Sequence, residues 1–428
     1  MTATLFPAGT RDSVTHLVLA SELAPVAALI GSDDPALAVR AAATLMTRLL
    51  LTRLPGPGCR LLREDFSFTG TLAEGDEVVI TAEVEAPSNP GVVHLYCAVR
   101  HADGSPILTG FAELSEPTER RGDLTGPFGT QPRRMLAALL ARCAGRPPVP
   151  TAVAHPCDAE SLRGALLAAS HGLITPILVG PEARIRAAAE GMDLSAFEIV
   201  ATPHSHASAE VAVRLVSEGR AAALMKGSLH TDELMGAALA REAGLRTERR
   251  VSHCFVMDAP LYPRPLIITD AAINIDPDLD AKADIIRNAI ALAAAMGVEL
   301  PRVALLSAVE TVTAKMVSTL HAAALCKMAD RGQITGALLD GPLAFDNAVS
   351  VAAAKAKGIV SAVAGRADVL VCPDIESGNM LAKQLALLGG AASAGIVLGL
   401  RVPMALTSRS DDANSRLASA ALLRLVAG

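Results

Sequence analysis

Short apolar segments alternate with alanine-rich helical segments over the last two thirds of the chain, and this alternation restricts the fold more than any other feature. Helical periodicity is clear over residues 281–296 and 314–330. The segments with the composition of buried strands are 152–154, 177–179, 221–225, 266–269, 303–307, 336–339, 369–372 and 395–398. Strands separated by helices form a mostly parallel sheet that helices cover on both faces. We therefore predict an α/β fold for this part of the chain.

The first 117 residues have a different pattern. An Ala/Leu-rich helical segment at 36–54 ends at a Pro-Gly-Pro-Gly sequence, residues 55–58. Segments with period-two alternation follow at 65–68, 77–85, 92–100 and 107–114. This order predicts a small α+β domain in which an antiparallel sheet wraps around one helix.

Proline and glycine are concentrated between residues 117 and 150, where one short helix is predicted at 133–142. Such composition marks a boundary between domains. We therefore predict a domain at 1–117, a linker at 118–134 and a larger domain at 135–428.

The overall composition limits the classes of function. The net charge is −6, there is no Trp and there are two Tyr, so neither charge nor aromatic surface favours nucleic acid. Seven scattered cysteines without a CxxC pair argue against a disulfide framework or a zinc site. No uninterrupted apolar run is long enough to span a bilayer, and the N-terminus has no signal-peptide pattern. We expect a cytoplasmic protein that acts on a polar small molecule.

One segment, residues 224–231, combines the groups that bind an anion. Lys226, Ser228, His230 and Thr231 come directly after the apolar run at 221–225. The carboxyl edge of a parallel sheet is where α/β proteins hold their ligands. A cation with several hydrogen-bond donors at close range suits a phosphate or a carboxylate.

Four later loops have the same design, at 269–275, 307–310, 340–348 and 407–412. Because parallel strands place their carboxyl ends at one edge, we expect these loops to line one cleft with residues 224–231. Arg409, together with Arg249 or Arg250, would add cationic donors. The candidate ligands of phosphate or substrate are Lys226, Ser228, His230, Thr231, Arg250, Ser307, Glu310 and Asp340.

Other kinds of site have weaker support. A metal held by Asp270, Asp340 and Asp346 is the alternative for these loops, but their placement in separate loops favours caps and turns. The chain has no GxxxxGK[ST] loop, no GxGxxG sequence that opens a helix, and no GxSxG elbow. The sequence therefore gives no support to the common nucleotide-binding loops or to an α/β-hydrolase.

These loops resemble the phosphate acetyltransferase/butyryltransferase family. The matching segments are LMKGSLHT (224–231), SHCFVMD (252–258), ITDAAINIDPDLDAKADIIRNA (268–289), LSAVE (306–310), KMADRGQITGALLDGPLAFDNAVS (327–350), PDIESGNMLAKQL (373–385), AGIVLG (394–399) and SR (408–409). The resemblance implies a two-lobed fold similar to isocitrate dehydrogenase, with lobe I at about 135–265 plus 398–428 and lobe II at about 266–397. It also implies a dimer or larger homo-oligomer, no metal or bound cofactor, and the reaction acyl-CoA + phosphate ⇌ acyl phosphate + CoA.

The resemblance assigns the catalytic chemistry to the end of the chain. Arg409 would hold the phosphate bidentately, and Ser408 would donate to the developing oxyanion or position the thiol of CoA. Relatives carry a carboxylate at the position of Ser415, so the base is unassigned here, with Asp411 and Asp412 the nearest substitutes. The alternative role for these two aspartates is helix N-capping. The Ser-Arg-x-Asp form is similar to the butyryl-type branch of the family.

The N-terminal domain resembles the MaoC-like dehydratase family, which has the hotdog fold. The segments that carry the resemblance are LTRLPGPGCRLLREDFSFTGTLAEGDEVVITAEVE (51–85) and ILTGFAELSEP (107–117). In the GDxNPxH-like loop of catalytic members, Asp and His activate water, but here Ser32 and Leu37 stand at those positions. Leucine cannot transfer a proton, so we expect a non-catalytic domain that assembles the protein or binds acyl-CoA. Two alternatives for the whole chain are a non-catalytic acyl-CoA-binding regulator and a bifunctional enoyl-CoA hydratase/phosphate acyltransferase.

Overall fold

The structure is a computed structural model of the whole chain. It describes residues 6–18, 23, 26, 36–56, 58–73, 75–85, 91–116, 134–189, 191–260, 262–407 and 411–427, and the side chains of 17, 36–38 and 134 are left out of the description. The chain divides into two compact units, residues 1–132 and 133–428, and each is described by itself.

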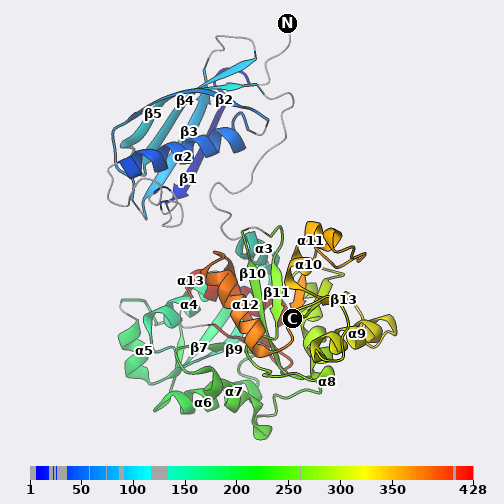
Figure 1. The fold of residues 1–428 in the computed structure, drawn as a ribbon. Helices are drawn as coiled ribbons and strands as arrows, with labels where there is room; N and C mark the ends of the chain where they lie inside the picture. Colours follow the sequence, from blue (N-terminus) through cyan, green and yellow to red (C-terminus); the bar gives the residue numbers. More distant parts are fainter. Residues whose placement is uncertain are drawn as a thin grey trace. The chain divides into compact units, whose positions relative to one another are not determined.

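The first unit is a five-stranded antiparallel sheet with one long helix, α2 (Ala36–Thr52), packed against it (Figure 1). The strands are β1 (Arg11–Leu17), β2 (Leu61–Phe68), β3 (Glu77–Val84), β4 (Val92–His101) and β5 (Pro106–Ser115), in the order β1-β3-β4-β5-β2. Alternate residues of β3 face the helix, so Val78, Ile80 and Ala82 are buried in one core with Met46 and Leu49 of α2. A sheet wrapped around a helix is the hotdog arrangement that the resemblance implies. Strand β1 was not predicted.

The second unit contains one sheet in which strands from both predicted lobes take part. Its order is β13-β12-β14-β11-β10-β15-β16-β9-β6-β7-β8. The strands are β6 (Val149–Ala154), β7 (Ile174–Gly180), β8 (Glu198–Ala201), β9 (Ala223–Lys226), β10 (Ser252–Asp258), β11 (Leu266–Thr269), β12 (Arg302–Leu306), β13 (Leu338–Leu343), β14 (Val369–Val371), β15 (Ala392–Leu398) and β16 (Met404–Ala405). The α/β prediction is confirmed, although β8, β10 and β16 were not predicted as strands.

Helices cover both faces of this sheet (Figure 1). One face carries α3 (Arg134–Cys143), α4 (Ala159–Ser170), α8 (Leu279–Ala295), α9 (Val317–Asp330) and α13 (Ala413–Val426), and α5 (Glu182–Ala188) adds Ile185 to their core. The other face carries α6 (Ser205–Ser217), α7 (Thr231–Leu239), α10 (Phe345–Val349), α11 (Val351–Ala356) and α12 (Ile375–Leu387). A short 3-10 helix, η1 (Arg241–Ala243), follows α7. Within the described parts of the chain, none of the helices combines the length and the apolar character needed to cross a bilayer.

Three antiparallel pairings in the middle of the sheet decide where its loops emerge. β16, β9, β6, β7 and β8 run parallel to one another, and so do β11, β14, β12 and β13. Between the two groups, the pairs β16–β15, β15–β10 and β10–β11 are antiparallel. An odd number of reversals makes the two groups run in opposite directions. The expectation that all five loops leave one edge is therefore wrong, because it did not include the antiparallel strand β10.

Candidate active site

The edge at which β9 ends carries a buried cation next to a tight turn. Lys226, the last residue of β9, is 3% exposed, and its Nζ donates to the carbonyl of Gly227 over 3.4 Å. A Cβ on Gly227 would lie 2.5 Å from the carbonyl oxygen of Ala154 and 2.6 Å from that of His155, so only glycine fits this turn. Ser228 donates to the carbonyl of His155 through its backbone N–H (2.9 Å) and through Oγ (2.8 Å). These bonds fix the turn to the end of β6.

Helix α7 begins directly after this turn. His230 is its N-cap residue, and the backbone N–H of His230 donates to Oε2 of Glu233 over 3.2 Å. Thr231 is the first helical residue and is half-buried. A helix N-terminus carries unpaired N–H groups and a partial positive charge. Lys226, Ser228, His230 and Thr231 therefore lie together at one edge of the sheet, in a setting that favours an anion.

His155, at the end of β6, was missed by the sequence analysis. It is buried and has a positive φ of 56°, a strained conformation for a residue with a Cβ. Its Nδ1 lies 3.0 Å from Oγ of Ser208. Ser208 donates its hydroxyl hydrogen to the carbonyl of His204 (2.8 Å), so it accepts from Nδ1–H of His155. The lone pair of this ring is therefore on Nε2.

A sequence signal for His155 existed. The His-Pro-Cys-Asp sequence at 155–158 follows the apolar run at 152–154, in the same way that Lys226 follows 221–225. Burial, followed by the charge of Arg184, lowers the pKa of His155, so the ring is neutral at pH 7. Asp158 is the N-cap of α4 and accepts from the backbone N–H of Ser161 over 2.8 Å.

The predicted catalytic pair, Ser408 and Arg409, lies outside the described residues. Thr407, directly before it, is buried, and its Oγ1 accepts a hydrogen bond of 2.9 Å from NH1 of Arg416. β16 runs parallel to β9, with Ala405 opposite Met225, so Thr407 emerges at the same edge as Lys226. Asp412 caps α13 by accepting from the N–H of Ser415 over 2.7 Å. Asp411 is half-buried next to it.

The opposite edge holds the loops that follow β11, β12 and β13. The buried carboxylate of Asp270 accepts from the N–H groups of Ala272 (2.9 Å), Ile273 (3.1 Å) and Asn274 (3.2 Å), and from the Asn274 amide (2.5 Å). These hydrogen bonds occupy the lone pairs of the Asp270 carboxylate and hold the loop after β11 in its conformation. Among the described residues, no three His, Cys, Asp or Glu side chains are placed to share a metal ion.

The other predicted ligands at this edge are held by their neighbours. Ser307 Oγ lies 2.8 Å from Oγ of Ser318. Asp340 was predicted in a loop but lies within β13, and its Oδ1 accepts from the N–H of Gly341 over 2.8 Å. Glu310 Oε2 accepts from Nζ of Lys357 (3.1 Å) and from the Asn347 amide (3.4 Å). The hydrogen bond from Lys357 lowers the pKa of Glu310.

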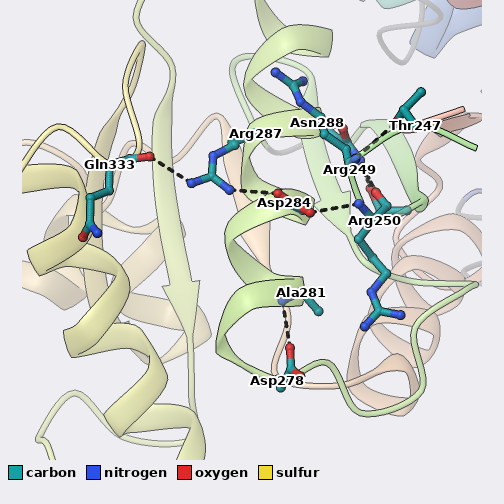
Figure 2. Close-up of polar contacts among 10 residues, drawn as sticks. Thr247, Arg249, Arg250, Asp278, Ala281, Asp284, Arg287, Asn288 and Gln333 are labelled. Carbon is teal, nitrogen blue, oxygen red and sulfur yellow. Dashed lines mark hydrogen bonds and ion pairs between the residues drawn. The ribbon is translucent and has the colours of Figure 1, made fainter. Parts of the chain in front are cut away.

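Arg250 also lies at this second edge, just before β10 (Figure 2). Its N–H donates to Oδ2 of Asp284 over 2.9 Å, and its carbonyl accepts from the Asn288 amide over 2.9 Å. Figure 2 shows the guanidinium of Arg250 reaching away from Asp284, which pairs with Arg287 instead. Arg249 lines a neighbouring cavity of about 510 Å³ together with Arg401. The structure thus separates Arg250, Ser307, Glu310 and Asp340 from the group at Lys226.

Comparisons with known proteins agree with the fold and the motifs. A family described as "Phosphate acetyl/butaryl transferase" matches residues 198–423. The phosphate acetyltransferase of Rhizobium meliloti is 62% identical over 291 residues, which are 68% of this chain and 92% of that protein. The phosphate butyryltransferase of Clostridium acetobutylicum is 43% identical over 279 residues, 65% of this chain and 93% of that protein.

A solved structure agrees as well. The branched-chain phosphotransacylase from Enterococcus faecalis V583 is 31% identical, with a TM-score of 0.57, over 64% of this chain and 99% of that one. From the match over residues 198–423 and the identity to these relatives, the chain belongs to the phosphate acetyltransferase/butyryltransferase family.

Proposed function

We propose that the chain catalyses the reversible transfer of a short acyl group between CoA and inorganic phosphate. The observation that carries the proposal is the buried Lys226 at the end of β9, in the turn that leads to α7 and inside the segment that matches the family. A buried cation beside a helix N-terminus is a setting for phosphate. The acyl group is acetyl or butyryl, since relatives of both names align with this chain.

In this proposal, the thiol of CoA attacks the carbonyl carbon of the acyl phosphate. The new C–S bond forms as the C–O bond to phosphate breaks, and phosphate leaves as an anion. Lys226, Ser228 and Thr231 bind the phosphate, Arg409 holds it bidentately, and Ser408 donates to the developing oxyanion. The thiol proton must pass to a base. Because the carboxylate of Asp412 is used to cap α13, Asp411 is the stronger candidate for this base.

The direct test is the release of CoA from acyl-CoA, followed with a thiol reagent. Acetyl-, propionyl- and butyryl-CoA are compared with and without phosphate. Release that depends on phosphate supports the proposal, and the ratio of the rates gives the preferred chain length. If no acyl-CoA from C2 to C4 gives phosphate-dependent release, the transferase proposal is wrong. Tight binding of acyl-CoA without turnover would then support the alternative of a non-catalytic acyl-CoA-binding regulator.

We propose that the first unit assembles the protein or binds acyl-CoA, without catalysis of its own. The loop at 31–35, which carries Ser32, lies outside the described residues, as does the side chain of Leu37. His94 lies on β4 within 3.5 Å of Glu85 and 3.9 Å of Glu113. The test is the absorbance of crotonyl-CoA without phosphate. A decrease would show that the hydratase alternative is correct.

We further propose a cytoplasmic homo-oligomer, at least a dimer, that needs no bound cofactor. Several large apolar side chains of the second unit are strongly exposed, among them Ile275, Val360, Leu387 and Leu388. Large apolar side chains left at the surface would be removed from water if two copies of the chain associated. Light scattering during size-exclusion chromatography measures the oligomeric state. A monomer at micromolar concentration would contradict the proposal.

A further inference from the structure

His253 is a fully buried histidine for which the proposed reaction has no use so far. It lies on β10, its exposed fraction is 0%, and within the described residues neither ring nitrogen has a partner at full hydrogen-bond geometry. Its ring makes an edge contact with Phe255, with centroids 4.4 Å apart. A buried polar group without a partner is costly, so its presence calls for a role.

A backbone hydrogen bond is missing from the sheet directly beside this ring. β15 and β16 are antiparallel with Ile396 opposite Ala405, which places Gly395 opposite Leu406. Residues in such a pair normally exchange two hydrogen bonds. Here the N–H of Leu406 donates to the carbonyl of Gly395 (3.2 Å), but the N–H of Gly395 donates to Oγ of Ser419 instead (3.0 Å). The carbonyl of Leu406 therefore does not accept the hydrogen bond that the N–H of Gly395 would normally donate.

The imidazole of His253 is placed next to that carbonyl. A Cβ on Gly395 would lie 2.3 Å from the oxygen of Leu406 and 3.0 Å from Nε2 of His253, so both atoms border the space that this glycine leaves open. Burial lowers the pKa of His253 to about 4, against the opposing effects of Asp270 and of the Leu406 backbone. The ring is therefore neutral at pH 7 and has one N–H to donate.

We propose that His253 is a positioning residue for acyl transfer, whose Nε2–H donates to the carbonyl of Leu406 in place of the missing backbone donor. Leu406 and Thr407 directly follow β16, and Ser408 is the next residue in the sequence. Arg416 holds Thr407 from the α13 side. His253, which comes from the strand next to Asp270, holds Leu406 from the other face. The kinetic part of this inference rests on the proposed function.

The test compares His253→Met with His253→Gln in the full-length protein. Methionine keeps the volume but has no donor, whereas the glutamine amide can still donate toward Leu406. We expect His253→Met to lower kcat about tenfold to a hundredfold, a loss typical of small misplacements in an active site, with little change in KM. His253→Gln should recover most of the rate. A purely structural role would instead lower the melting temperature and leave kcat unchanged.

Hydrogen exchange of peptides covering residues 403–407 tests the contact between His253 and Leu406 independently of enzyme activity. Faster exchange in His253→Met than in His253→Gln supports the contact, even if the wild type proves to have no transferase activity. Equal exchange in both variants and the wild type would overturn it. Ser419→Ala provides an independent check, because it lets Gly395 donate to Leu406 again. The effect of His253→Met on exchange should then shrink, and an undiminished effect would overturn the inference.

Discussion

Lys282 in α8 lies with its Nζ 3.1 Å from Nδ1 of His321 in α9. The ammonium group can only donate, so His321 accepts through Nδ1 and carries its own proton on Nε2. Lys282 is buried, and burial lowers its pKa against the opposing charges of Asp276, Asp374 and Asp278. Burial, and then the charge of Lys282, lower the pKa of His321.

This pair should make the second unit sensitive to acid. Because the folded-state pKa of His321 is below its ordinary value of 6.5, the unfolded chain binds more protons in that range. The stabilisation is complete above pH 6.5 and is lost as the pH falls through the folded pKa. His321→Gln can still accept from Lys282 but does not titrate. Its melting temperature should fall less than that of the wild type between pH 7 and pH 5, and parallel curves would refute the prediction.

Gly227→Ala should damage both the fold and the activity. The new Cβ would meet the backbone oxygens of Ala154 and His155 at 2.5 and 2.6 Å, and backbone atoms cannot move aside cheaply. We expect a loss of about 2 kcal/mol or more in unfolding free energy and a large loss of phosphate-dependent turnover. The matched control is Gly236→Ala in α7, where nothing lies within 4 Å of the new Cβ. That variant should gain up to about 1 kcal/mol. Equal denaturation midpoints for the two would contradict the argument.

Lys226→Met should weaken the binding of phosphate without unfolding the protein. Methionine retains most of the side-chain volume, so the variant should still fold and unfold cooperatively. The KM for phosphate should rise at least tenfold, about 1.4 kcal/mol, while the KM for acyl-CoA changes less. Lys327→Met is the control, since Lys327 pairs on the surface with Asp330. An unchanged phosphate KM in Lys226→Met would remove Lys226 from the proposed site.

Thr407→Val should destabilise the second unit. The substitution keeps the shape but removes the hydroxyl that accepts from buried Arg416 over 2.9 Å. A hydrogen bond to a charged group contributes about 1.5–3 kcal/mol, so we expect a loss of that order in urea denaturation. Thr407→Ser retains the acceptor and should lose less. If both variants unfold at the same urea concentration, the bond to Arg416 contributes little.

The α/β architecture and the turn at Lys226 could be predicted from local patterns. An apolar run followed by helical periodicity determines a strand and its covering helix, because each must bury its own apolar face. The Lys-Gly-Ser turn follows from the same reasoning, since a strand end and a helix start are both encoded within a few residues. The same signal at His155 was available in the sequence but was overlooked.

The pairing of strands could not be predicted in this way. Residues 252–258 were recognised as a family motif and not as a strand. The antiparallel pairing of β10 with β11 and β15 depends on contacts between residues far apart in the chain. That pairing sends the loops of Asp270 and Ser307, together with the end of β13, to the edge opposite Lys226. It also places His253 beside Leu406, which is 153 positions later in the sequence. The sequence by itself determined which elements form and which groups stand at their ends, because these are local. Only the tertiary structure decided which ends meet, because strand direction is fixed by hydrogen bonds between distant segments.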